Sequence, residues 1–221
     1  YCDFAVVPLG NNINSINGYG SRTVKEYLKY LHKEILSIKH KSYLSTIYFG
    51  GGTPSILHPE QIKYLVNLFR ENYGIDYGAE ITMEVDPASF DEDDLYKFIK
   101  AGINRFSLGA QSFNNQILHN AGRRHTKKDV EQSCLWLKKA YDSRVIKSWS
   151  IDLIQNLPLS GFKEWQADLE KTIKYSPPHI SIYDLNIENG TVFKKLLDLG
   201  RLPIPNEDES FRNCKTTNDI L

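Results

Sequence analysis

The sequence predicts an α/β protein in which helices flank a parallel sheet. Short runs of apolar, β-branched and aromatic residues alternate with longer segments whose apolar residues recur every three or four positions. This alternation favours parallel strands joined by helical crossovers. Polar or glycine residues follow most of the short runs, and ligands bind at the carboxyl ends of the strands in such sheets. The pattern is compatible with a closed barrel, a partial barrel or a doubly wound sheet.

Five segments have the composition of strands, because they are short and rich in apolar and β-branched residues. In chain order they cover residues 46–49, 80–85, 105–108, 145–154 and 179–185. The first of them ends in three glycines, and the fourth carries an aspartate inside an apolar run.

Six segments have helical periodicity, and local residues indicate where several of them begin or end. Pro59 suits a first helical turn, and the apolar pattern after it stops before Gly74. A helix opened by Ser89 or Asp91 ends at Gly102. The predicted helices cover about 22–39, 59–73, 91–101, 126–137, 165–173 and 192–199. The order is therefore one helix followed by five strand–helix pairs.

Composition excludes several classes of protein. The 221 residues include 27 basic and 27 acidic residues, and zero net charge argues against bulk binding of nucleic acid or anionic membranes. No apolar run approaches the roughly 20 residues that span a bilayer. Three widely spaced cysteines form no disulfide framework, which indicates a reducing compartment. The cytoplasm is expected, with a plastid or mitochondrion as the alternative.

Polar residues at the strand ends predict a ligand site. Three glycines, Gly50 to Gly52, open the backbone to a ligand, although a tight turn would explain them equally well. If buried, Glu84 needs a cationic or hydroxyl-bearing partner, although a salt bridge at the rim would explain it equally well. Asp152 lies between apolar neighbours. Gln111 can donate and accept hydrogen bonds, and Arg123 can bind a carboxylate, although a solvated charge run is the simpler explanation of the arginine. Together they suit a zwitterionic nucleoside.

A family-independent alternative is a phosphate-binding barrel isomerase or aldolase. The glycine loop would bind the phosphate, and Glu84 or Asp152 would act as the base. The absence of a lysine at the predicted strand ends disfavours the Schiff-base form of this chemistry.

A series of motifs resembles one protein family. In order they are Tyr1-Cys2-Asp3-Phe4, Tyr48 to Ser55 (YFGGGTPS), Glu84 to Pro87 (EVDP), Arg105 to Phe113 (RFSLGAQSF), Gly122 to Thr126 (GRRHT), Asp152 to Ile154 with Leu157-Pro158, and Tyr183 to Leu185 with Glu188 to Thr191. Together they resemble radical SAM proteins of the oxygen-independent coproporphyrinogen III oxidase-like group. The resemblance covers nearly the whole chain and implies a partial (β/α)6 TIM-like barrel over residues 1–200. Residues 201–221 would begin a carboxyl-terminal region.

The resemblance implies two cofactors, a [4Fe–4S] cluster and S-adenosylmethionine. Cys2 matches the last of three cluster cysteines, and the other two would precede Tyr1, so the chain is expected to be a fragment. The residues that match the family's contacts to S-adenosylmethionine are Tyr1, Gly51, Gly52, Thr53, Glu84, Gln111, Arg123 and Asp152.

Phe4 distinguishes branches within this family. The oxidases carry a further cysteine two residues after the last cluster ligand, and here that position is Phe4. The chain therefore resembles the HemW branch of heme-binding trafficking proteins, with heme as cargo or ligand and heme-acceptor proteins as partners. The alternative is an oxygen-independent coproporphyrinogen III dehydrogenase, with a porphyrinogen substrate and a reductant of the flavodoxin or ferredoxin type.

Overall fold

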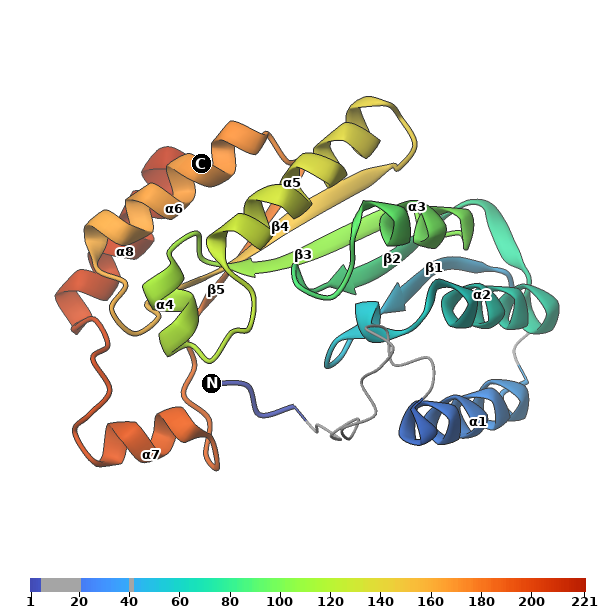
Figure 1. The fold of residues 1–221 in the computed structure, drawn as a ribbon, viewed down its shortest axis with the longest axis horizontal. Helices are drawn as coiled ribbons and strands as arrows, with labels where there is room; N and C mark the ends of the chain where they lie inside the picture. The colour runs from blue at the N-terminus through green and yellow to red at the C-terminus, as the bar shows by residue number, and fades with distance from the viewer. Residues whose placement is uncertain (5–20, 40–41) are drawn as a thin grey trace. The chain divides into compact units, whose positions relative to one another are not determined.

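A computed structural model describes residues 1–4, 21–39 and 42–221 of the chain (Figure 1). The described residues form one sheet of five parallel strands in the order β1-β2-β3-β4-β5. Each strand thus neighbours the next one in the sequence, without the reversal of order that defines a doubly wound sheet. This topology confirms the predicted α/β class and favours the partial barrel over the doubly wound alternative.

The strands and helices follow the predicted alternation. The strands are β1 (Leu44–Phe49), β2 (Ile75–Val85), β3 (Arg105–Gln111), β4 (Ser148–Gln155) and β5 (His179–Asp184). The helices are α1 (Arg22–Ser37), α2 (Pro59–Tyr73), α3 (Glu92–Lys100), α4 (Asn115–Asn120), α5 (Lys127–Asp142), α6 (Phe162–Tyr175), α7 (Val192–Asp198) and α8 (Glu207–Ile220), with a 3-10 turn at Pro54–Ile56. Helices α4 and α8 were not expected from the sequence.

The chain divides into two compact units, and each is described by itself. The β1–β2 unit comprises the described residues of 5–107 together with 140–148. Its core is apolar, and Ile62, Met83 and Phe98 are buried completely. The side chain of Asn104 binds the backbone of β2 at two residues. It accepts from the Ile81 N–H and donates to the Ala79 carbonyl, both at 2.9 Å. Polar contacts thus hold β2 in place before its carboxyl end.

The β4–β5 unit comprises residues 1–4, 108–139 and 149–221. Strands β4 and β5 pair in parallel, and Asp152 lies opposite Ser181 in their register. Helices α6 and α8 pack side by side (Figure 1). The buried Trp165 of α6 donates to the Asn213 carbonyl and to the Thr217 hydroxyl of α8. Polar contacts therefore help to hold α8 against α6.

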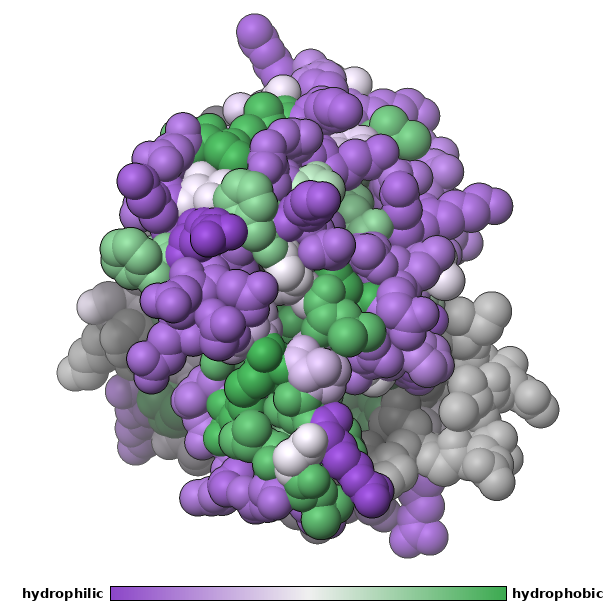
Figure 2. All heavy atoms as spheres, turned by 90° about the vertical axis from the view of Figure 1, so that its left-hand side faces the viewer, coloured by the Kyte–Doolittle hydropathy of each residue, from purple (hydrophilic) through white to green (hydrophobic). Residues whose placement is uncertain are grey.

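Part of the surface of the β4–β5 unit is apolar. Figure 2 shows apolar side chains gathered low on the face that carries α7. The exposed apolar residues of this region include Val192, Leu197, Leu199 and Ile204. A patch of this kind is typical of a surface that another protein segment covers. Within the described ranges, no helix is both long and apolar enough to cross a membrane.

Candidate functional site

In the β1–β2 unit, the predicted residue Glu84 holds the loop that follows β1. One oxygen of its carboxylate accepts from the Tyr48 hydroxyl at 2.8 Å, and the other accepts from the Gly51 N–H at 3.2 Å. The sequence predicted a cationic or hydroxyl-bearing partner for Glu84, and Tyr48 is the hydroxyl-bearing one. Both carboxylate oxygens therefore have a donor within the unit itself.

The three glycines of this loop differ in whether the space around them or the backbone conformation requires glycine. A Cβ at Gly50 would lie 2.7 Å from a ring carbon of Tyr48 and 3.2 Å from a Glu84 carboxylate oxygen. Gly51 has a φ of 114°, which L side chains rarely adopt, whereas a Cβ at Gly52 would meet open space. Gly50 and Gly51 are thus required by the loop itself, and Gly52 leaves space where a ligand can approach the backbone.

Two buried serines that the sequence did not predict for the site connect this loop to the end of β2. The Ser55 hydroxyl hydrogen-bonds the Ser89 hydroxyl and accepts from the Asp86 N–H at 3.0 Å. Ser89 also donates to the Asp86 carbonyl at 2.7 Å. Thr53 lies between the glycines and this connection, directly before the 3-10 turn. The only sequence signal for Ser55 was its place at the end of the glycine motif.

In the β4–β5 unit, the structure brings together Arg123 and Tyr1. The guanidinium of Arg123 donates to the Tyr1 hydroxyl at 3.2 Å and to the Gly109 carbonyl near the end of β3 at 3.4 Å. The Tyr1 ring packs against Phe193, with 6.0 Å between the ring centroids. Arg123 is half-buried, and its side chain is oriented by the strand, so it is not the solvated charge that the simpler explanation required.

Gln111 and Asp152 belong to strands of this unit, Gln111 as the last residue of β3 and Asp152 within β4. Asp152 is buried in β4, with 9% exposure, and accepts a hydrogen bond of 3.3 Å from Ser150. The side-chain oxygen of Gln111 is buried and has no hydrogen-bond partner among the described residues. A buried polar oxygen without a partner is costly, so this atom fits a ligand that brings a hydroxyl or an ammonium group.

The described residues offer one thiol at this site. Cys2 is exposed, whereas Cys134 lies in the core, where burial raises the pKa of its thiol, and Cys214 belongs to α8. No group of three or more His, Cys, Asp or Glu side chains in the described part of the chain could hold a metal ion. These residues can therefore contribute a single ligand, Cys2, to an iron–sulfur cluster.

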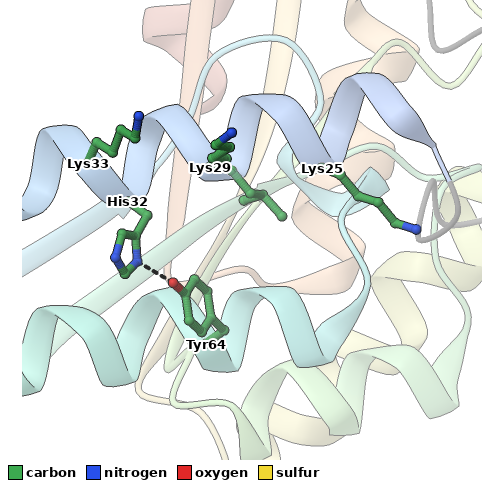
Figure 3. A pocket seen from close by; sticks show the side chains of 6 residues that line it. Lys25, Lys29, His32, Lys33 and Tyr64 are labelled. Carbon is green, nitrogen blue, oxygen red and sulfur yellow. Dashed lines mark hydrogen bonds between the residues drawn. The ribbon is translucent and has the colours of Figure 1, made fainter.

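A separate groove of about 370 Å³ lies between α1 and α2 in the β1–β2 unit. Figure 3 shows His32 of α1 turned toward Tyr64 of α2, and the Tyr64 hydroxyl hydrogen-bonds the Nδ1 atom of the His32 ring. Lys25, Lys29 and Lys33 line the groove on the α1 side. None of the residues predicted for the ligand site lies in this groove, so it is distinct from the strand ends.

Comparison with known proteins identifies the family of this chain. The family model described as the radical SAM superfamily matches residues 1–152. The chain belongs to the radical SAM superfamily. All of the predicted site residues, from Tyr1 to Asp152, lie within the matched segment.

Curated relatives of this radical SAM chain include bacterial and animal proteins. The chain is 36% identical over 211 residues to a "Heme chaperone HemW" of Synechocystis sp., covering 95% of this chain and 49% of the relative. It is 32% identical over 212 residues to "Radical S-adenosyl methionine domain-containing protein 1, mitochondrial" of Danio rerio, covering 94% of this chain and 47% of the relative. The chain thus spans about half the length of the curated relatives it matches.

A solved structure has the same fold. The coproporphyrinogen III oxidase HemN of Escherichia coli, described as a radical SAM enzyme, superposes with a TM-score of 0.75 at 25% identity. The superposition covers 89% of this chain and 45% of that protein. Sequence and structure therefore both assign the chain to HemW- and HemN-like radical SAM proteins.

Proposed function

We propose that the chain is the S-adenosylmethionine-binding core of a heme chaperone of the HemW type. The observation that carries the proposal is Phe4, which stands where the resembling oxidases have a further cysteine. The many relatives named as heme chaperones support the same branch, and several match at least 85% of the chain. Heme is then the cargo, and heme-acceptor proteins are the partners.

The residues at the strand ends suit the polar groups of S-adenosylmethionine. Arg123 suits the carboxylate, because a guanidinium forms two parallel bonds to it. The backbone of Gly51, Gly52 and Thr53 suits the ammonium group. A cluster with bound S-adenosylmethionine supplies one-electron chemistry, and the protein supplies orientation and electrostatics.

Five further residues are part of the proposal. Glu84, Gln111 and Asp152 present carbonyl and carboxylate oxygens that accept hydrogen bonds from ribose hydroxyls or the ammonium group. Tyr1 lies against Arg123 and provides a ring for the adenine, while Cys2 contributes one thiolate to the cluster. All three cysteines of the chain are free thiols. This agrees with a reducing compartment, and we propose the cytoplasm or, alternatively, a plastid or mitochondrion.

The second candidate is oxidative decarboxylation of coproporphyrinogen III. The superposition with HemN favours it, because that protein is an enzyme and the polar residues proposed for S-adenosylmethionine are all present here. This function requires a reductant of the flavodoxin or ferredoxin type. Phe4 disfavours it.

The experiment compares heme binding with turnover in the anaerobically purified full-length protein. We expect calorimetry to detect S-adenosylmethionine binding and hemin titration to produce a saturable absorbance change. Chemically reduced protein should convert no coproporphyrinogen III under conditions in which HemN does. Decarboxylated product would favour the second candidate, and failure to bind either heme or S-adenosylmethionine would overturn the proposal.

A further inference from the structure

Asp168 of α6 is a buried carboxylate that the proposed site does not use. It is 3% exposed, yet no lysine or arginine of the described segments forms an ion pair with it. Its two oxygens accept hydrogen bonds from consecutive residues just beyond β3. The Ser112 hydroxyl donates at 2.6 Å, and the Phe113 N–H donates at 2.8 Å.

Burial of this carboxylate disfavours its charged form. Desolvation raises the pKa of Asp168 to about 6, although the hydrogen bonds from Ser112 and Phe113 act in the opposite direction. The folded protein therefore holds this proton between about pH 4 and pH 6, where the unfolded chain has lost it, and stability falls as the pH rises through that window. Stability at neutral pH thus does not explain a carboxylate at this position.

The segment that Asp168 holds is strained. Gln111 has a φ of 67°, and the Ser112 N–H donates to the Ala110 carbonyl at 2.8 Å across it. A bond from residue i to i+2 around a central residue with positive φ is a γ-turn of the rare, strained kind. Such strain persists only where the surroundings enforce it.

The hydrogen bonds of Asp168 enforce this turn from its carboxyl side. Ser112 donates to Asp168 and accepts from the Asn114 N–H at 3.1 Å, and Asn114 caps α4. Asp168 therefore connects α6 to both residues after Gln111 and, through Ser112, to the start of α4. The buried oxygen of Gln111 that lacks a partner belongs to the residue at the centre of this turn.

We propose that Asp168 is a positioning residue, which holds the strained turn so that the Gln111 side chain meets the ligand at the end of β3. This inference rests on the proposed function, because it takes S-adenosylmethionine as that ligand. Asp168 itself lies in α6 and acts through Ser112 and Phe113. Its loss should change ligand affinity more than the stability of the fold.

The test uses Asp168→Asn, Ser112→Ala and the double variant in the anaerobically purified protein. Asparagine keeps the volume of aspartate but has one acceptor oxygen for two donors. We expect Asp168→Asn to raise the Kd for S-adenosylmethionine about tenfold, since hydrogen bonds to a charged group have that magnitude. Its urea midpoint at pH 8 should be equal to or above that of the unmodified protein. The double variant should lose less affinity than the product of the two single effects.

Glu170→Gln is the matched control, because Glu170 is an exposed acid on the same helix and should bind with unchanged Kd. Amide exchange at residues 109–114, measured without ligand, should be faster in Asp168→Asn but not in the control. An unchanged Kd, or a loss of affinity that only follows a loss of stability, would overturn the inference. If Asp168→Asn does not fold, Ser112→Ala decides by the same two measurements.

The exchange experiment separates this inference from the proposed function. If the unmodified protein binds no S-adenosylmethionine, the proposed function fails, while faster exchange in Asp168→Asn would still show that Asp168 holds the turn. If the unmodified protein binds and the variant binds equally well, the positioning role alone fails.

Discussion

The two units carry polar strand ends that differ in how their hydrogen bonds are completed. In the β1–β2 unit, Glu84 has a donor on each oxygen, from Tyr48 and from the Gly51 backbone. In the β4–β5 unit, the side-chain oxygen of Gln111 is buried and has no partner among the described residues. The hydrogen bonds of Glu84 are thus made within its own unit, whereas the Gln111 oxygen has no donor among the described residues and can accept one from a ligand.

This difference indicates that the two units of this radical SAM core prepare their polar residues for a ligand in different ways. The β1–β2 unit holds a glycine loop in shape, because the carboxylate of Glu84 bonds to its backbone. The β4–β5 unit instead orients individual side chains, since Arg123 is held by a strand carbonyl and Gln111 by a strained turn. Variants in the β4–β5 unit should therefore affect ligand affinity, and those in the glycine loop should also affect folding.

The largest effect is expected for Arg123→Ala. Loss of the guanidinium should raise the Kd for S-adenosylmethionine about 100-fold, because a carboxylate would lose a charged, two-bond partner. Arg124→Ala is the matched control, since Arg124 is adjacent and exposed. Calorimetry under anaerobic conditions measures both. Equal effects of the two variants would mean that only general positive charge matters, and the comparison between the units would fail.

A smaller effect is expected for Glu84→Gln. The amide keeps one acceptor oxygen for the two donors Tyr48 and Gly51, so the loop loosens and the Kd should rise about tenfold. Glu80→Gln on the same strand is the control, because Glu80 is exposed and bonds only locally to Thr82. Affinity can be followed by the same titration. A variant that binds as tightly as the unmodified protein would show that the contacts of Glu84 serve the fold alone.

The smallest effect distinguishes two neighbouring glycines. Gly51→Ala should lower the free energy of unfolding by about 1 kcal/mol, because alanine is strained at a φ of 114°. Gly52→Ala should change it by less than about 0.5 kcal/mol, since a Cβ there meets open space. Urea unfolding of both variants measures the difference. A Gly52→Ala protein with normal stability but weak S-adenosylmethionine binding would strengthen the proposal that a ligand approaches this backbone.

Local sequence patterns were sufficient for most of the fold. The five strands and six of the helices lie where periodicity and the capping residues placed them, because those signals act within a few residues. Helix α8 was missed because its sequence is mostly polar. It begins with a capping box of Asn206 and Glu209 and is held by Trp165, which lies more than 40 residues away. Helix α4 has only six residues, too few to produce a periodic pattern.

The sequence by itself determined the class of fold, the family and the residues at the strand ends, because parallel strands bring their carboxyl ends to one edge. Only the tertiary structure decided how those residues are held. The bond from Tyr48 to Glu84 joins positions 36 residues apart, and the bond from Ser112 to Asp168 joins positions 56 residues apart. No periodic sequence pattern relates positions that are so far apart in the chain. The turn at Gln111 likewise depends on a carboxylate buried by the packing of α6, and packing arises only when the whole chain has folded.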